Sequence, residues 1–443
     1  MTTTTDIGTR TVRKVLRRFL PILILCYFAL YLDRLNLSVA ALTMNDELGI
    51  TPAIYGLVAG VFFWTYSLFE IPSNYIVSRV GVRVWVARII VSWGLVTMIT
   101  AAAAGPGSLV VLRLLLGVAE AGFSPAMLFF LASWIPSSRR AAAISLMIVS
   151  VPLSGIGTPI SMHIIDAMEG VAGMSGWRWM FLITGLPPVI LGYFFYRIIR
   201  NRPADAQFLN PDERAWLESE LAKERTSLGG EAKHSFFRGL ANPRVAALVV
   251  VYILYAFSLF GYQFFIPQIL KQFGLSNIAV GWVALIPPLL AVGPMLWWCR
   301  HSDRKQERIR HFAITGVLAA VGFCVAGLFL HEPFVAFVGF CLAGIGLYCC
   351  MPIQLSIPST FLSGAALAAG LATINGLGNI GGYFGPQVTG IIREATGGFP
   401  VAVLVLSAAI LASALLALLV DRRIRRGRET ESAAGARDVV STS

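Results

Sequence analysis

Tyr31-Leu32-Asp33-Arg34-Leu35-Asn36 lies inside the first apolar segment of the chain, after an almost unbroken apolar run from Phe19 to Leu30. The segment is long enough to cross a bilayer as a helix. A charged side chain at the centre of such a helix costs about 2.5–3.5 kcal/mol on insertion scales. Because this stretch holds both an acid and a base, we expect it to face a helix bundle or a water-filled cavity rather than lipid.

Helical spacing groups the polar residues of this segment into stripes. Residues at i, i+4, i+7 and i+11 share one face of a helix, and here they are Tyr27, Tyr31, Arg34 and Ser38. Asp33 and Asn36 border that stripe. The same spacing recurs in a later apolar segment, where it joins Arg113, Gly117, Glu120 and Ser124. Two helices are therefore predicted to bring an acid and a base into one bundle.

These four charges suit the coupled movement of a proton and an anion. Burial favours the neutral form of a carboxylate, whereas a neighbouring arginine favours the charged form. An Asp or Glu between these influences can load and release a proton, and an arginine can bind a substrate carboxylate with two hydrogen bonds. Alternatively, Asp33, Arg34, Arg113 and Glu120 only neutralise one another as buried ion pairs.

The composition identifies a membrane protein. Of the 443 residues, 56% are hydrophobic and 13% are charged, whereas soluble domains have about 25% charged residues. A soluble enzyme is thereby excluded, and we expect no enzymatic activity and no cofactor. The net charge of +12 resides in short basic runs between apolar segments, which fits the positive-inside rule rather than nucleic-acid binding. None of the six cysteines forms a Cys-x-x-Cys pair, so no metal site is predicted.

The fold class predicted is an all-α membrane protein with twelve transmembrane helices in two six-helix halves. A hydropathy window of about 19 residues places the spans at 19–42, 53–77, 84–104, 108–132, 141–165, 178–199, 244–270, 278–299, 311–330, 333–355, 365–392 and 398–420. The predicted regions are an N-terminal tail (1–18), an N-terminal half (19–199), a central loop (200–243), a C-terminal half (244–420) and a C-terminal tail (421–443).

Basic residues concentrate in alternate loops and at both chain ends. The positive-inside rule therefore places both termini in the cytoplasm. The central loop contains Asn210-Pro211-Asp212-Glu213, a helix-start pattern with Pro at the first position and a Glu that reaches back. It predicts a short helix over residues 214–224, although a plain linker between the halves is the alternative.

An internal repeat supports two related halves. The loop after the second span carries Arg79, Gly81 and Arg83, and the loop after the eighth carries Asp303, Arg304 and Arg308. Repeated halves with a site near the midplane between them are typical of transporters. The middles of the C-terminal spans carry neutral polar side chains only, among them Tyr252, Gln263, Asn375 and Asn379. Glu70, near the inner end of the second span, is expected to be structural and to pair with loop arginines.

Several motifs together resemble the anion:cation symporter family of the major facilitator superfamily. They are residues 31–36 with Ala40-Ala41-Leu42-Thr43-Met44-Asn45, Phe69-Glu70-Ile71-Pro72-Ser73-Asn74, Arg113 to Phe123, Trp177-Arg178-Trp179-Met180-Phe181 and Pro211 to Leu217. The pattern is most similar to bacterial tartrate, sugar-acid and hydroxyphenylacetate permeases. Ser78 departs from the family, because the loop motif usually has Asp at this position.

The resemblance implies proton-driven uptake of a small organic anion across the bacterial inner membrane. We further expect the chain to function as a monomer. Asp33 and Glu120 would be the protonatable pair, Arg113 would tune Glu120, and Arg34 would bind the substrate carboxylate in alternation with Asp33. Tyr31, Tyr66 and Asn375 match positions that line the substrate cavity, and Gln263 is a further candidate from the C-terminal half. The predicted partners are the anion, protons and membrane lipid. An organic-anion exchanger or exporter, and a transporter-like sensor, are the alternatives.

The charge pattern makes the topology testable. In a cysteine-free background, a single cysteine at Asp46 should react with a membrane-impermeant thiol reagent from outside the cell, and one at Ser227 only from inside. Labelling of both positions from the same side would contradict the odd number of spans, five, that the prediction places between them.

Overall fold

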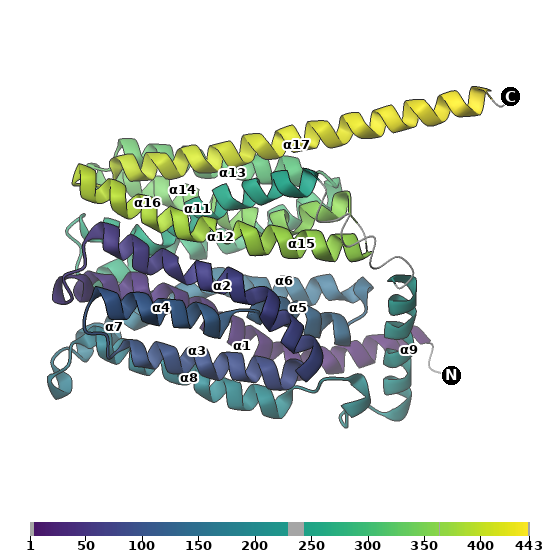
Figure 1. Cartoon of the computed structure of the whole chain (residues 1–443), viewed down its shortest axis with the longest axis horizontal. Helices are drawn as coiled ribbons and strands as arrows, with labels where there is room; N and C mark the ends of the chain where they lie inside the picture. Colours follow the sequence, from purple (N-terminus) through teal and green to yellow (C-terminus); the bar gives the residue numbers. More distant parts are fainter. Residues whose placement is uncertain (1–3, 229–242, 363, 442–443) are drawn as a thin grey trace.

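Two groups of roughly parallel helices form the molecule in the computed structural model (Figure 1). The structure describes residues 4–228, 243–362 and 364–441, and every regular element within them is helical. In Figure 1 the first half of the chain forms one layer of the bundle and the second half forms the other. Both chain ends lie at the same end of the bundle. We call it the inner end, because the charge pattern predicts that it is cytoplasmic, and the opposite end the outer end.

The N-terminal half consists of α1 (Thr4–Glu47), α2 (Pro52–Val80), α3 (Val82–Thr100), α4 (Pro106–Glu120), α5 (Phe123–Trp134), α6 (Ser137–Leu153), η1 (Ser154–Ile156), α7 (Gly157–Ala167), η2 (Val171–Gly173) and α8 (Gly176–Ile198). The connecting region holds η3 (Pro203–Asp205) and α9 (Pro211–Leu228). The C-terminal half consists of α11 (Pro243–Lys271), α12 (Asn277–Lys305), α13 (Arg308–Leu328), α14 (Pro333–Ser356), η4 (Ile357–Thr360), α15 (Gly364–Gly378), α16 (Gly381–Thr396) and α17 (Pro400–Ser441).

The twelve-helix prediction is confirmed, with interruptions inside some spans. Eleven helical segments of the described chain are long and apolar enough to cross a membrane. The predicted span 365–392 corresponds to α15 and α16, which are separated at Asn379 and Ile380, so neither piece reaches that length. The predicted span 108–132 likewise divides into α4 and α5. Gly122 lies at that division with φ of +86°, and an added Cβ would lie 2.3 Å from Ser73 Oγ.

Residues 4–18, within the predicted N-terminal tail, form the first part of α1, which begins at Thr4. This part is ordered by α9, whose Glu213 is fully buried. Lys14 donates to Glu213 at 2.9 Å, and Arg10 lies 3.0 Å from the same carboxylate. Burial alone would raise the pKa of Glu213, but the hydrogen bonds and charges of its cationic neighbours together hold this pKa below its usual range. The ion pairs therefore attach α9 to the N-terminal half.

The helix predicted in the central loop is confirmed and is longer than expected, because α9 spans 18 residues. The Asn210 backbone N–H donates to Glu213 Oε2 at 3.1 Å, as the helix-start pattern predicts. Near the other end of α9, Arg140 donates to Glu224 at 2.9 Å. The helix thus crosses the inner end of the N-terminal half and contacts it at both ends (Figure 1).

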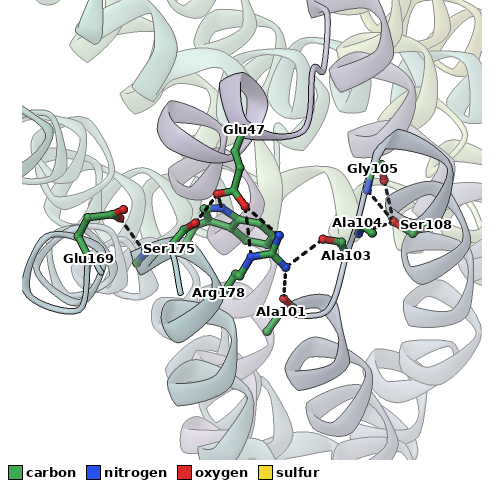
Figure 2. Close-up of polar contacts among 11 residues, drawn as sticks. Glu47, Ala101, Ala103, Ala104, Gly105, Ser108, Glu169, Ser175 and Arg178 are labelled. Carbon is green, nitrogen blue, oxygen red and sulfur yellow. Dashed lines mark hydrogen bonds and ion pairs between the residues drawn. The ribbon is translucent and has the colours of Figure 1, made fainter. Parts of the chain in front are cut away.

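At the outer end, Glu47 joins three segments of the N-terminal half (Figure 2). Its carboxylate accepts from Ser175 and Trp177, each at 2.5 Å, and from Arg178 at 2.8 Å. Arg178 also donates to the carbonyls of Ala101 and Ala103, at 2.7 and 3.0 Å. The network fixes the end of α1, the turn after α3 and the start of α8 to one another, and it gives the Trp177-Arg178 motif a structural role.

The two halves touch most closely along α2 and α16 at the outer end. Cβ atoms added at Gly56, Gly60 and Gly390 would lie 2.2–2.6 Å from the backbone oxygens of Pro386, Tyr383 and Pro52. Only glycine allows such an approach without a shift of the backbone. Tyr55 adds a hydrogen bond to the Phe264 carbonyl at 2.9 Å. The structure is therefore closed at the outer end.

Candidate functional site

A buried ion pair between α1 and α4 is the centre of the candidate site. Arg34 donates from Nε and Nη2 to Glu120 Oε2, at 3.2 and 3.1 Å. The Glu120 side chain is fully buried and that of Arg34 is 11% exposed. Both bonds converge on one carboxylate oxygen, so Glu120 Oε1 is buried and has no hydrogen-bond partner among the described residues.

This pairing differs from the sequence-based expectation for Arg34. We expected Arg34 to alternate between Asp33 and the substrate, and we expected Arg113 to tune Glu120. In the structure Glu120 pairs with Arg34, while Asp33 Oδ1 accepts a hydrogen bond from Thr97 at 2.7 Å. Adjacent residues of a helix point in directions about 100° apart, so Asp33 and Arg34 face different neighbours.

Aromatic rings surround the Arg34 guanidinium. Its central carbon lies 5.4 Å from the centroid of the Tyr31 ring, 5.3 Å from Phe62 and 5.2 Å from Tyr66. Ring faces at such distances attract a cation, more strongly where water is excluded. Tyr31 and Tyr66, both predicted site residues, thus lie against Arg34. A guanidinium held by ring faces stays charged and oriented even if its carboxylate partner changes.

Asp33 lies among polar side chains inside the N-terminal half, where it accepts a hydrogen bond from Thr97. It is 3% exposed, and its Oδ2 is buried without a partner among the described residues. The nearby Asn36 donates to Thr184 at 2.9 Å and accepts from Ser161 at 3.2 Å. These bonds fix α1 against α7 and α8. The two buried acids therefore lie in separate environments.

Arg113 makes no ion pair within the described residues, although it is 4% exposed. Its guanidinium donates to the carbonyls of Val58 and Ala59 on α2, at 3.3 and 3.4 Å. It also lies 5.0 Å from the centroid of the Phe62 ring. The same ring lies 5.3 Å from the Arg34 guanidinium, so both arginines contact Phe62. Arg113 can influence Glu120 through its charge, but it does not bind Glu120 directly.

Glu70 was expected to pair with loop arginines, and the structure shows a different partner. It is 5% exposed, and its Oε1 accepts a hydrogen bond at 3.1 Å from Asn375 on α15, in the other half. Tyr252 of α11 donates to Asn375 at 3.3 Å. Glu70 is therefore a candidate site residue that the sequence analysis missed. The sequence signal that could have identified it is an acidic residue inside a predicted span, two positions before Pro72.

Two further predicted side chains, Gln263 and Tyr31, lie where the two halves meet. Gln263 donates to the Tyr348 hydroxyl at 3.2 Å. Tyr31 packs against the small cluster formed by Tyr348, Val151 and Ala291. Tyr348 therefore links Gln263 to Tyr31, and through it to Arg34. These contacts connect Gln263, Tyr31 and Arg34 across the boundary between the halves.

In the part of the chain that the structure describes, Arg79 and Arg83 of the first repeated loop contact residues of their own half. Arg79 lies over the Tyr75 ring, and Arg83 donates to the Tyr196 carbonyl at 2.8 Å. Gly81 has φ of +92°, and an added Cβ would lie 2.5 Å from the Asn201 side chain. These contacts fix the inner ends of α2, α3 and α8.

The corresponding loop of the C-terminal half has similar internal bonds. Arg308 lies 3.8 Å from Asp303 and donates to the Ser356 carbonyl at 2.8 Å. Arg304 is exposed in the last turn of α12. Ser78 donates to the Tyr75 carbonyl, so the side chain that replaces the usual Asp bonds within its own helix.

Comparison with known proteins identifies the family. A sequence model of the Major Facilitator Superfamily matches residues 23–386 and, in a second match, residues 248–442. The chain belongs to the major facilitator superfamily. It is therefore a multi-pass membrane protein of a transporter family, as the resemblance predicts.

Two relatives and one solved structure illustrate the range of the family. A putative tartrate transporter of Agrobacterium vitis is 42% identical over 94% of this chain and 96% of its own length. A quinolone resistance transporter of Acinetobacter baumannii is 33% identical over 94% of this chain and 96% of its own. The partially occluded, inward-open xylose transporter XylE of E. coli aligns with a TM-score of 0.70 over 90% of this chain and 96% of that chain, at 14% identity.

The observed ion pair makes a specific prediction about stability. Arg34→Gln should lower the free energy of unfolding by about 3–5 kcal/mol, because it leaves the buried Glu120 carboxylate unpaired. The double variant Arg34→Gln/Glu120→Gln should regain much of this loss. The measurement is thermal unfolding of the purified protein in detergent. The matched control is Arg34→Gln/Asp33→Asn, which should stay as unstable as Arg34→Gln. Rescue by the Asp33 change instead would contradict the observed pairing.

Proposed function

We propose that the chain imports a small organic acid together with protons by alternating access between its two halves. The substrate class follows the relatives: the name of the 42% identical protein is putative tartrate transporter. The bacterial relatives support a location in the inner membrane, and the basic inner end supports cytoplasmic termini. The transported ligands are then the anion and protons, and the surrounding partner is lipid.

The observation that carries the proposal is the Arg34–Glu120 pair. A substrate carboxylate has the same charge and shape as the Glu120 side chain, so it can take over the two hydrogen bonds from Arg34. Glu120 would then lie buried without its cation, where the neutral form is strongly favoured. Anion binding at Arg34 and proton uptake at Glu120 thus favour each other.

This exchange assigns roles to the neighbouring residues. Tyr31 and Tyr66 keep the guanidinium in place while its anionic partner changes. Arg113 limits proton affinity at Glu120 through its charge. Asp33, which has its own unpartnered oxygen, supplies the second proton-binding carboxylate. Its separation from Arg34 implies that it responds to helix movement rather than to direct contact with the substrate.

The C-terminal half contributes neutral hydrogen-bonding groups to the same site. Asn375 and Gln263 are positioned to bind hydroxyl or carboxylate oxygens of the substrate. Because Asn375 is bonded to Glu70 across the interface, substrate contact with Asn375 can change how the halves hold together at the inner end. The repeated loops would hold the inner ends of their helices together while the halves move. Their residues are Arg79, Gly81, Arg83, Asp303, Arg304 and Arg308. The proposal takes the chain to function as a monomer.

Exchange or export is the second candidate, because one relative is named as a quinolone resistance transporter. The same alternating movement serves either direction, so the site alone does not distinguish them. A sensor that binds an anion without moving it would retain the site but show no flux.

Transport by the purified protein in proteoliposomes tests the proposal, with L-tartrate as the first probe, followed by a sugar acid and an aromatic acid. An imposed inward proton gradient should drive accumulation. Asp33→Asn and Glu120→Gln should each abolish gradient-driven accumulation, while Glu120→Gln should retain counterflow. Arg34→Lys should weaken the apparent affinity about ten- to a hundred-fold, because an ammonium cannot reproduce the planar fork. The matched control is Glu218→Gln, a change of an exposed acid on α9.

The outcomes separate the candidates. Full gradient-driven accumulation by both acid variants would show that the proton site lies elsewhere. Counterflow without any response to the proton gradient would support an exchanger. Loss of preloaded acid driven by the inward proton gradient, with no accumulation, would support export. Binding with no counterflow for any of the three acids would support a sensor.

A further inference from the structure

A polar cavity lies at the inner end of the N-terminal half, away from the proposed transport site. Its volume is about 590 Å3, and its lining comes from the start of α3, the segment after α8, η3 and α9. The lining residues are Arg83, Arg200, Asn201, Ala204, Asp205, Gln207 and Arg214. Three arginines and one aspartate give this lining a formal charge of +2 (three minus one).

The three arginines are not neutralised by protein carboxylates. Within the described residues, none of them forms a salt bridge, and Asp205 is not within ion-pair distance of any. Each guanidinium is instead anchored to backbone carbonyls. Arg83 donates to Tyr196, Arg200 to Arg197 and Arg214 to Ala206, at 2.8, 2.9 and 2.8 Å. The anchored arginines therefore place positive charge around the cavity. Their remaining N–H groups can donate hydrogen bonds to a bound anion.

Arg214 provides a more specific signal. Its Nε is buried and has no hydrogen-bond partner among the described residues. A buried unpaired donor costs free energy unless something else accepts its hydrogen bond. Phosphate oxygens are strong acceptors with the geometry that a guanidinium fork prefers. The cavity thus combines excess positive charge, an unsatisfied buried donor and the space for an anionic group.

The surroundings of the cavity are those of a membrane boundary. Arg83 lies in the first turn of α3, and α8 ends at Ile198, so the cavity stands where two predicted spans leave the bilayer. Close by on these helices, Val84, Tyr193 and Tyr196 are 46%, 58% and 42% exposed. Exposed tyrosines are typical of the headgroup level. An apolar surface for acyl chains therefore adjoins a basic cavity.

We propose that this cavity binds the phosphate of an anionic phospholipid headgroup, with the acyl chains along the outer faces of α3 and α8. Basic pockets beside transmembrane helices on the cytoplasmic side are known to suit such headgroups. A free phosphate ion shares the headgroup chemistry, but it makes no use of the adjoining apolar surface. Because Arg83 belongs to α3 and Arg214 to α9, one bound headgroup links the connecting helix to the six-helix half. The proposal does not depend on which solute is transported.

The test is a titration of the delipidated, detergent-purified full chain with phosphatidylglycerol, phosphatidylcholine or inorganic phosphate. Native mass spectrometry reports the bound lipid, and the melting temperature reports stabilisation. Phosphatidylglycerol should bind and raise the melting temperature more than phosphatidylcholine or phosphate. Arg83→Gln/Arg214→Gln should weaken phosphatidylglycerol binding about thirty-fold, from the loss of two basic contacts. The matched control, Arg17→Gln/Arg197→Gln, removes two exposed arginines outside the cavity lining and should bind as the unaltered chain does.

Three results would overturn the proposal. Equal stabilisation by inorganic phosphate would indicate a free-anion site, and equal weakening in both double variants would indicate only general attraction between charges. Unchanged binding in Arg83→Gln/Arg214→Gln would exclude the cavity. If that variant fails to fold, Arg200→Gln alone provides the same comparison, with a smaller expected loss of about five-fold.

Discussion

A carboxylate that is fully removed from water needs either a cation or a proton. The Glu120 carboxylate is fully buried in the N-terminal half, and Arg34 on a different helix supplies the cation. The cost of separating the pair without replacement is several kcal/mol. This requirement couples α1 to α4 and fixes Arg34 in its aromatic surround. In the proposed function, it would also make the affinity for a transported anion depend on the protonation of Glu120.

The rest of the structure supports the alternation that such a site needs. Close glycine contacts between α2 and α16 close the outer end, while the observed polar link between the halves near the inner end is Glu70 with Asn375. The packed contacts of α2 with α16 and the Glu70–Asn375 hydrogen bond would open in different ways. Packing responds to the rocking of rigid halves, whereas a hydrogen bond can be exchanged for one to a substrate. In the proposed function, Asn375 would therefore connect occupancy of the site with opening of the inner end.

Much of this arrangement follows from the sequence. Apolar segments of sufficient length and the alternation of loop charges predict the helices, and charges inside two spans predict which helices contribute to the site. The partner of Arg34 did not follow, because spacing along a helix determines the faces of that helix but not the rotation of its neighbours. Glu70 was misassigned for a related reason: its partner is 305 positions away in the chain. The breaks at Gly122 and at Asn379–Ile380 depend on contacts between helices, which hydropathy does not report.

The central claim is that an anion displaces Glu120 from Arg34 and that Glu120 then takes up a proton. It is tested most directly by counting protons on substrate binding, by calorimetry of the purified protein in buffers of different ionisation enthalpy. The ligand is the small carboxylate that raises the melting temperature most. By linkage, binding should take up about one proton per anion near neutral pH in the unaltered chain and none in Glu120→Gln. Tight anion binding to the unaltered chain with no proton uptake would contradict the account.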